Sequence, residues 1–481
     1  MIISQSGCYH TSDNELPTWD PLSTSRVDSA HHELTWHPTL PSSLYFIQEM
    51  ALWRWDLGSK LPQRIVSADS YGPLYFGKLA HPTFAPGPVD VTSYRLAVNE
   101  QNLIAKLWRP STPESTSVTS LVAVNPTTHV SVTLVTSDAS SNPIGLFDIT
   151  VDGKYLLYHG LGLESPNALD LGNRTQSAST KAGGLDYGAI FAMEISNSAN
   201  INEVGYCDPE YEESIRVSCE RFAQSPDGKQ FVFADGRGVW LADIPAGNPR
   251  LIAKHQYKFP ESLCGIWGPV RWSPKGRKLL IGIGCFEGGM YGLMDVDTGE
   301  VQTLEKTFAY VGSHAHVAWS LDGDEIVVAR ATDMSSHLYT VPAEDTSQIT
   351  SIISGTIESG GFIPMYPQFL PDGKIAFANQ KCDGDPGAAT GLYSVTVANP
   401  EPVLIEELPS ITCDKKNMIS RYDAFGRILW SERGDAYLHF RNDGQRTYQP
   451  HQLGLVDGSY ERNVEEILSE ADSFSLTWSD E

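Results

Sequence analysis

One five-residue phrase recurs along the chain and constrains what the chain can fold into. Its clearest copy, Ser-Pro-Asp-Gly-Lys, occupies residues 225–229 and lies between two apolar stretches. Proline fixes φ and an Asp-Gly pair supplies the positive φ of a tight turn, so the phrase predicts a hairpin between two strands. Degraded copies occupy residues 150–154, 273–277, 320–324, 370–374 and, most weakly, 422–427.

The spacing of these copies predicts the architecture. Their glycines are Gly153, Gly228, Gly276, Gly323, Gly373 and Gly426. After a first step of 75 residues, consecutive glycines are 48, 47, 50 and 53 residues apart. A strand-turn-strand unit that repeats every 40 to 50 residues or so is typical of β-propeller blades. We therefore expect an all-β fold, a single β-propeller of seven or eight four-stranded blades with very little helix.

The repeat divides most of the chain into blade-sized units. Five of them, each with the same order of strands and turns, span residues 217–255, 264–306, 314–353, 362–406 and 417–465. A sixth unit, 145–207, carries an insertion rich in Gly, Ser and Asn around residues 164–187. Loops of this length in compact folds are usually functional or disordered, so the insertion is a candidate partner-binding loop.

The part of the chain before the repeats lacks the phrase but contains strand-like runs. Three strands of a divergent blade are expected at 33–36, 43–46 and 52–55, and a further blade within 79–137. We assign residues 32–481 to the propeller. The strand-like run 474–478 is expected to pair with the first blade, which would remove an exposed sheet edge.

The phrase with its flanking apolar runs resembles the WD40-like repeat (PD40) of TolB-type propellers. It also occurs in the propellers of prolyl-oligopeptidase-type peptidases and of oligogalacturonate lyases, and the resemblance covers about residues 145 to 435. The resemblance implies the fold and leaves the activity open, because unrelated chemistries share this scaffold. A serine-peptidase half is not expected, since the sequence contains no Gly-x-Ser-x-Gly motif.

The chain is strongly acidic, with 59 Asp and Glu against 34 Lys and Arg and a net charge of −25. Phosphate binding needs clustered cations, so neither nucleic acid nor an anionic membrane surface is an expected partner. A solvated acidic surface that keeps the protein in solution accounts for the charge, and binding of cations or of a basic partner is the alternative. No apolar run reaches the roughly 18 residues of a transmembrane segment.

Seven cysteines bear on the compartment. Six of them form neighbouring pairs in the repeat region: Cys207 and Cys219, Cys264 and Cys285, Cys382 and Cys413. Sequential pairing is the simplest connectivity and predicts three disulfides, hence a periplasmic, outer-surface or secreted protein. Six buried thiols in a cytosolic protein are the alternative. A zinc site is not expected, because no Cys-x-x-Cys spacing occurs.

The seventh cysteine, Cys8, belongs to an N-terminal segment of different character. Residues 1–31 are polar and rich in Ser, Thr and Asp, which is typical of a flexible segment. Ser6-Gly7-Cys8 resembles the end of a bacterial lipoprotein signal, in which the cysteine carries the lipid. This resemblance makes Cys8 a candidate lipidation site and the segment a tether.

His314-Ala315-His316 is the strongest local candidate for chemistry. Alternate residues of a strand face the same way, so both imidazoles should point to one side of a blade's first strand. The pair resembles the His-x-His pair of oligogalacturonate lyases, which implies a channel site for a divalent metal (manganese, zinc or calcium), with His255 as a further candidate ligand. Two hydrogen-bonded histidines at the channel mouth are the alternative interpretation.

Several other residues are weaker candidates. Arg271 and Arg421 lie at first-strand positions, where they could face a charged substrate or serve the structure. The acidic turns 295–300 and 383–387 could hold calcium, but neither fits the EF-hand loop, and the first is typical of a turn between outer strands. Residues 173–175, Asn-Arg-Thr, form a glycosylation sequon inside the insertion.

Two functions from different classes follow. The first is a non-enzymatic propeller of the cell envelope or exterior that binds a protein partner or an assembly. It is favoured because the sequence has no complete catalytic set and no nucleotide-binding loop. The second is an enzyme that cleaves uronate-containing polysaccharide by β-elimination with a channel metal, in which case carbohydrate is the partner.

Overall fold

The computed structural model is all-β over the part of the chain that it describes. That part comprises residues 27–28, 33–36, 43–48, 51–56, 63–66, 90–96, 103–109, 118–124, 131–138, 144–150, 152–161, 188–207, 210–211, 215–216, 222–235, 237–254, 256–259, 262–285, 288–310, 314–331, 335–355, 361–379, 387–408, 427–430, 434, 436–442, 448–456 and 461–463. No helix occurs among these residues.

The strands of the first half pair antiparallel and in chain order. One sheet contains β1 (Val27–Asp28), β2 (Glu33–Trp36), β3 (Ser43–Gln48), β4 (Ala51–Asp56) and β5 (Gln63–Val66). The next contains β6 (Asp90–Leu96), β7 (Leu103–Arg109), β8 (Val118–Val124) and β9 (Ser131–Asp138). A third contains β10 (Ile144–Ile149), β11 (Tyr155–Leu161), β12 (Gly188–Glu194) and β13 (Ile201–Cys207). A small ladder follows, made of β14 (Glu210–Tyr211) and β15 (Ile215–Arg216).

The second half continues the pattern. The next sheet contains β16 (Phe222–Gln224), β17 (Gln230–Asp235), β18 (Gly238–Asp243) and β19 (Gly247–Lys254). Five strands follow in β20 (Gln256–Phe259), β21 (Ser262–Trp272), β22 (Lys278–Cys285), β23 (Gly288–Asp295) and β24 (Val301–Tyr310). Another sheet contains β25 (His314–Trp319), β26 (Glu325–Ala331), β27 (Ser336–Pro342) and β28 (Thr350–Gly355). The last two contain β29 (Pro364–Phe369), β30 (Ile375–Asn379), β31 (Gly391–Val395) and β32 (Val403–Glu407), and then β33 (Arg427–Trp430), β34 (Ala436–Asn442), β35 (Tyr448–Leu455) and β36 (Glu461–Asn463).

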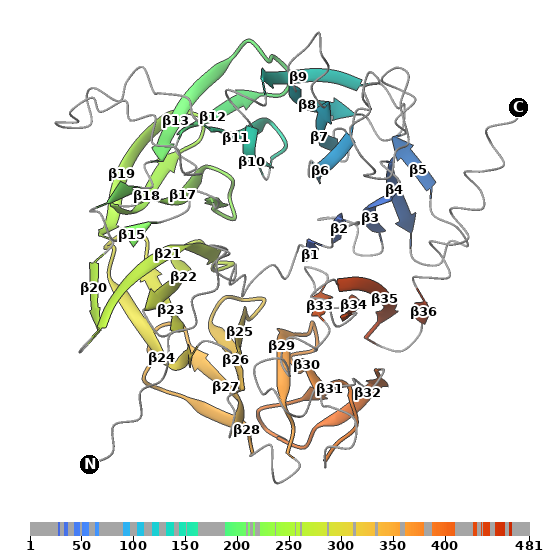
Figure 1. The fold of residues 1–481 in the computed structure, drawn as a ribbon. Helices are drawn as coiled ribbons and strands as arrows, with labels where there is room; N and C mark the ends of the chain where they lie inside the picture. Colours follow the sequence, from blue (N-terminus) through green and yellow to red (C-terminus); the bar gives the residue numbers. More distant parts are fainter. Residues whose placement is uncertain are drawn as a thin grey trace, which may run out of the picture.

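The sheets follow one another around a central space, with first strands such as β6, β10, β25 and β29 innermost and fourth strands such as β9 and β28 outermost (Figure 1). This is the arrangement that the repeat predicts. Two sheets have five strands rather than the expected four. In one of them β21 extends beyond its pairing with β22, and its first residues pair with β20. The run 474–478, the segment 1–26 with Cys8 and residues 422–426 of the weakest copy of the phrase lie outside the described residues, whereas Arg427, the last residue of that copy, begins β33.

The repeated phrase forms the predicted hairpin turn. In the clearest copy the Ser225 hydroxyl donates to Oδ1 of Asp227 at 2.7 Å, and Oδ1 also accepts the backbone N–H of Lys229 at 3.1 Å. Gly228 has a φ of 67°, and the glycines of the four other described copies have φ between 70° and 80°. These values lie in the left-handed region that favours glycine, which explains why glycine is the constant residue of the phrase.

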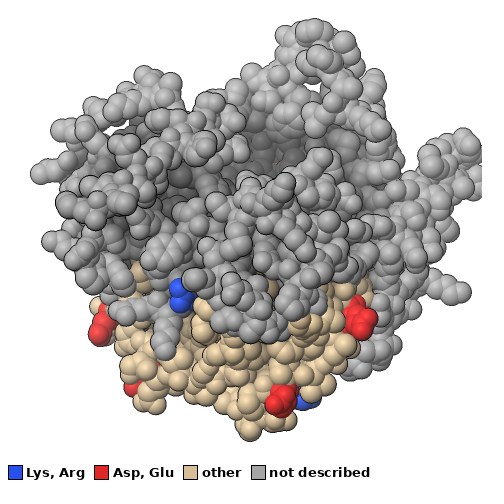
Figure 2. Space-filling model, turned by 60° about the horizontal axis from the view of Figure 1, so that its bottom comes forward, with Lys and Arg blue, Asp and Glu red and all other residues tan. Residues whose placement is uncertain are grey.

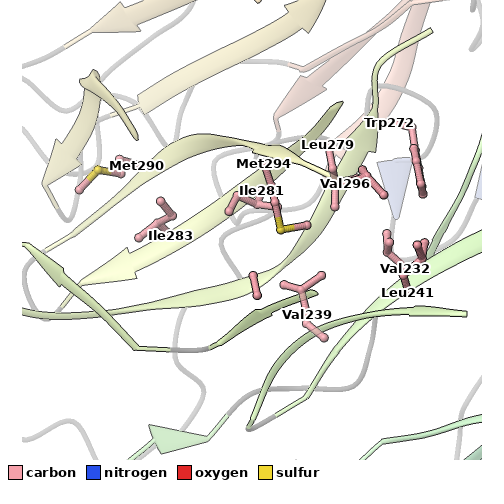
Figure 3. Packing of buried hydrophobic residues seen from close by; sticks show 12 residues of the cluster. Val232, Val239, Leu241, Trp272, Leu279, Ile281, Ile283, Met290, Met294 and Val296 are labelled. Carbon is pink, nitrogen blue, oxygen red and sulfur yellow. The ribbon is translucent and has the colours of Figure 1, made fainter. Parts of the chain in front are cut away.

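The core lies between neighbouring sheets. Val232, Val239 and Leu241 from the β16–β19 sheet pack against Leu279 and other buried side chains of the β20–β24 sheet (Figure 3). Both faces of these sheets are covered by neighbouring sheets. The sequences of their second strands are therefore continuous apolar runs, without the alternation of apolar and polar residues that a half-exposed strand shows. Indole groups also join the sheets: Nε1 of Trp272 donates to the Ala223 carbonyl and Nε1 of Trp430 to the Tyr366 carbonyl, each at 2.8 Å.

Candidate functional site at the loop-bearing end

The two ends of each sheet differ in their connections. At one end, here called the turn end, the first strand turns into the second through the repeated phrase. At the opposite end, here called the loop-bearing end, the second strand leads to the third and each sheet connects to the next. The longer connecting segments, 162–187 and 409–426, join strands at the loop-bearing end and lie outside the described residues.

A polar residue closes the apolar run of the second strand in four sheets. These residues are His159 on β11, Asp235 on β17, Arg330 on β26 and Asn379 on β30. Each stands six or seven residues after the turn glycine, which places it at the loop-bearing end. Arg330 is half-buried and the other three are buried. Our sequence analysis missed this set, although a polar residue directly after each apolar run is a visible signal.

Asp235 organises a rigid cluster at the hairpin between β17 and β18. Its carboxylate is fully buried; Oδ1 accepts the Arg237 backbone N–H and the Trp240 indole N–H, each at 2.9 Å. Oδ2 accepts Nε of Arg237 at 2.9 Å and also contacts Nη2. The guanidinium carbon lies 4.4 Å from the centre of the Trp240 ring, in cation–π geometry. Arg237 and Trp240 stay partly exposed, so the cluster presents a fixed arginine–tryptophan surface.

His159 is an imidazole buried on β11. Burial lowers its pKa to about 4, while a hydrogen bond to the backbone of Gly188 acts in the opposite direction. The side chain is therefore neutral at neutral pH. Gly188 is required beside it: a Cβ at this position would lie 1.9 Å from the Gly160 carbonyl oxygen and 3.2 Å from Nε2 of His159.

Asn379 ties two connections together. Its Oδ1 accepts the Ile363 backbone N–H at 2.7 Å, and its Nδ2 donates to the Ala389 carbonyl at 2.8 Å. Ile363 precedes the first strand of this sheet and Ala389 precedes the third. The amide thus fixes the course of both segments at the loop-bearing end.

The predicted histidine pair lies on β25, the first strand of its sheet. The register pairs His314 with Ala331 and His316 with Ala329, so the two histidines share one face of the sheet, as predicted. That face packs against β29, where the ring of Tyr366 lies 4.2 Å from the ring of His316. The backbone of Tyr366 is strained, with a φ of 49° at a bulge before Gln368.

The described residues do not complete the predicted metal site. No group of three His, Cys, Asp or Glu side chains comes together among them. Of the three predicted ligands, only His316 has a described side chain, and this ring packs against an aromatic ring; His255 and Arg421 lie outside the described residues. Arg271 is half-buried on β21, the strand that leads into the repeated phrase of its sheet.

The acidic turn at 295–300 is a structural turn. Oδ1 of Asp295 accepts the backbone N–H groups of Asp297 and Thr298 and the Thr298 hydroxyl, at 2.9 to 3.1 Å. The N–H of Thr298 leads the interactions that lower the pKa of Asp295. The carboxylate is thus occupied by its own turn. Of the second acidic turn only Gly387 is described, and the glycosylation sequon and the insertion around 164–187 lie outside the described residues.

One predicted cysteine pair is placed by the backbone register. Cys264 of β21 stands directly opposite Cys285 of β22 on adjacent antiparallel strands. Cys207 ends β13, whereas Cys219, Cys382 and Cys413 lie outside the described residues.

The described part of the face in Figure 2 carries few charges. Acidic and basic side chains lie among uncharged residues, and at the lower edge an acidic side chain lies beside a basic one. Within the described residues there is also no helix with the length and apolar character of a membrane span.

No protein-family model and no curated protein matches this chain. Among solved structures, it is similar to a prolyl endopeptidase with a TM-score of 0.45 and 10% identity, over 87% of this chain and 54% of that one. An oligogalacturonate lyase in complex with manganese gives 0.39 and 11%, over 73% and 85% of the two chains. A TolB-like protein of Agrobacterium tumefaciens gives 0.28 and 15%, over 60% and 90%.

The chain therefore spans about half the length of the prolyl endopeptidase. The kinds of propeller that the repeated phrase resembles, TolB-type and oligogalacturonate-lyase-type, are among the structures similar to this chain. At 10 to 15% identity these likenesses concern the fold and not the activity.

Proposed function

We propose that this protein is a non-enzymatic propeller whose loop-bearing end binds a protein partner. The observation that carries the proposal is the cluster of Asp235, Arg237 and Trp240. Arginine and tryptophan are enriched among the residues that dominate binding energy at interfaces. Here both are held by one buried carboxylate before any partner arrives, which reduces the entropy lost on binding.

The proposed scaffold is a closed ring of eight blades. The eight sheets of four or five strands support this number. Pairing of the run 474–478 with the β1–β5 sheet would close the ring. Removal of residues 470–481 should then lower the denaturation midpoint of the full-length protein, and an unchanged midpoint would contradict closure by this segment.

We further propose an oxidising compartment: the periplasm, the outer surface or the exterior, with Cys8 as a lipid anchor where the tether is retained. Support comes from the Cys264–Cys285 register. A disulfide closing a loop of this size stabilises by about 3 kcal/mol in the chain-entropy model. Peptide mapping of protein alkylated without reductant should therefore yield a cross-linked pair, and recovery of both cysteines as alkylated thiols would refute it.

Co-purification from extracts of the source organism tests the binding function. Wild-type protein should retain a stable partner, and Arg237→Ala should lose it, because the substitution removes the exposed half of the cluster. Lys229→Ala at the turn end is the matched control and should retain the partner. A monomer that turns over a substrate would overturn the proposal.

The second candidate is an enzyme that cleaves uronate-containing polysaccharide. The specific observation in its favour is that His316 lies on an inner strand beside Tyr366, whose backbone is strained. With His314 and His255, His316 would hold a divalent metal (manganese, zinc or calcium). The metal would supply charge neutralisation of a uronate carboxylate, which acidifies the neighbouring C–H for removal by a base.

Elemental analysis separates the two candidates. Near-stoichiometric manganese, zinc or calcium that is lost in the His314→Ala, His316→Ala double variant, together with unsaturated products from uronate polymers, would establish the enzyme. Metal-free protein that is inert on these polymers is the outcome that the binding function predicts.

A further inference from the structure

Arg330 and Tyr339 share one face of the β25–β28 sheet. Tyr339 stands opposite Val328 in the register of β26 and β27, and both pack against the β20–β24 sheet. Arg330 follows Val328 by two residues on the same strand, so its side chain leaves the sheet on the same face. The two side chains therefore meet in the layer between two neighbouring sheets, and Arg330 lies at the loop-bearing end.

Both side chains have buried donors without an acceptor in the described part of the chain. Nε of Arg330 is buried and has no hydrogen-bond partner there, and no described carboxylate pairs with this guanidinium. Tyr339 is 5% exposed, and its hydroxyl likewise has no hydrogen-bond partner. Each such donor destabilises the folded protein while it stays unsatisfied.

The described hydroxyl on the facing strand does not supply the acceptor. On the facing strand β24, the Thr307 hydroxyl accepts the Tyr291 backbone N–H at 2.8 Å and donates to the Leu304 carbonyl. Burial raises the pKa of Tyr339, and the nearby charge of Arg330 acts in the opposite direction. The phenol is protonated at neutral pH, so a positive charge and a second hydrogen-bond donor stand together.

Parts of both side chains border open space, although the two donor atoms themselves are buried. Arg330 is half-buried rather than enclosed. Tyr339 also lines an open cleft of about 310 Å³ between β24 and β27, together with Leu304 and Val341. The described lining of the cleft carries no charge. An arginine without a counter-charge at such a place attracts an anion through charge-assisted hydrogen bonds.

We propose that Arg330 and Tyr339 form a binding site for a carboxylate group. A carboxylate is planar and has two oxygens, so one can accept from the arginine fork and the other from the tyrosine hydroxyl. The site rests on the proposed function, in which the carboxylate is an acidic side chain of the protein partner. A uronic acid offers the same chemistry and is the competing source.

The proposal is tested on the purified full-length protein by calorimetric titration with acetate at constant ionic strength. Acetamide, which has the same shape without the charge, is the control ligand. Wild type and Arg277→Gln, an exposed arginine at the turn end, should bind acetate saturably and acetamide not at all. Arg330→Gln and Tyr339→Phe should each weaken acetate binding at least about 10-fold.

Stability measurements separate loss of the site from loss of the fold. Without ligand, Tyr339→Phe should be as stable as wild type or more stable, because it removes an unsatisfied buried donor.

Absence of saturable acetate binding, or equal binding by wild type and Arg330→Gln, would overturn the site. Tighter binding of an acetylated aspartate amide than of galacturonate identifies a protein source, and the reverse order identifies a sugar. No partner is needed, so failure here is distinct from failure of the partner proposal.

Discussion

The two ends of the sheets use similar polar residues in opposite ways. At the turn end, Asp227 and Asp322 are exposed and accept hydrogen bonds from their own turns. At the loop-bearing end, Asp235 is buried and holds an arginine and a tryptophan that remain partly exposed. The repeated turns thus satisfy their own hydrogen-bonding groups. The residues that differ between sheets instead leave polar groups that can bind a partner. We place function at the second end for this reason.

Removal of one carboxylate from each end gives the largest expected contrast. Asp235→Ala should lower the free energy of unfolding by about 3–5 kcal/mol, because it leaves the Arg237 charge and the Trp240 indole without their acceptor. Asp227→Ala should cost only about 1 kcal/mol, since water replaces an exposed acceptor. Denaturant unfolding of both variants measures the difference. Equal losses of unfolding free energy in the two variants would contradict the proposed difference between the two ends.

The pH dependence of stability should also separate the two ends. The pKa of His159 is about 4 in the folded protein against 6.5 in the unfolded chain, so the unfolded state binds the extra proton between these values. Stability should therefore fall as the pH drops from 6.5 towards 4, by up to about 3 kcal/mol. His159→Leu should remove this slope, and His337→Gln should keep it.

The turn carboxylates act in a lower pH range. Hydrogen bonds from the Ser225 hydroxyl and the Lys229 backbone lower the pKa of Asp227, and those from Ser320 and Asp324 lower that of Asp322. Their contribution is present above the unfolded value of 3.8 and is lost as the pH falls through the lower folded values. A slope above pH 4 that persists in His159→Leu would assign it to other groups.

The smallest expected difference is the one between the glycines of two turns. Gly373 has a φ of 80°, and a Cβ added there would meet no atom within 4 Å. Gly373→Ala should therefore cost only the strain of a left-handed alanine, about 1–2 kcal/mol. Gly323→Ala should cost more, because its Cβ would lie 3.1 Å from the Pro274 side chain. Thermal unfolding of the two variants measures which substitution lowers the stability more.

The hairpins could be predicted because their chemistry is local. The hydrogen bonds of the turn that involve the Ser225 and Asp227 side chains stay within six consecutive residues, and the spacing of the turns predicted the succession of sheets. The site depends on residues that only the fold brings together. His316 meets Tyr366, 50 residues later, through the packing of β25 on β29. Arg330 and Tyr339 can be recognised only once their neighbours have been searched for an acceptor.

Local sequence did contain one signal that we passed over. Asp235, Arg237 and Trp240 lie within six residues, and the charged pair interrupts an apolar pattern at the end of a strand. The metal site stays a prediction, since the side chain of only one of its three predicted ligands, His316, is described. In this structure the described ring of the pair contacts an aromatic side chain of the next sheet.

Lysine footprinting of the complex tests the central claim most directly. Lys154, Lys229, Lys275 and Lys374 are exposed at the turn end, and Lys254 is exposed at the end of β19, at the loop-bearing end. Acetylation rates are compared by mass spectrometry in the free protein and in the complex. The account predicts protection of Lys254 and unchanged rates for the four others. Protection of the turn-end lysines with Lys254 unchanged would contradict it.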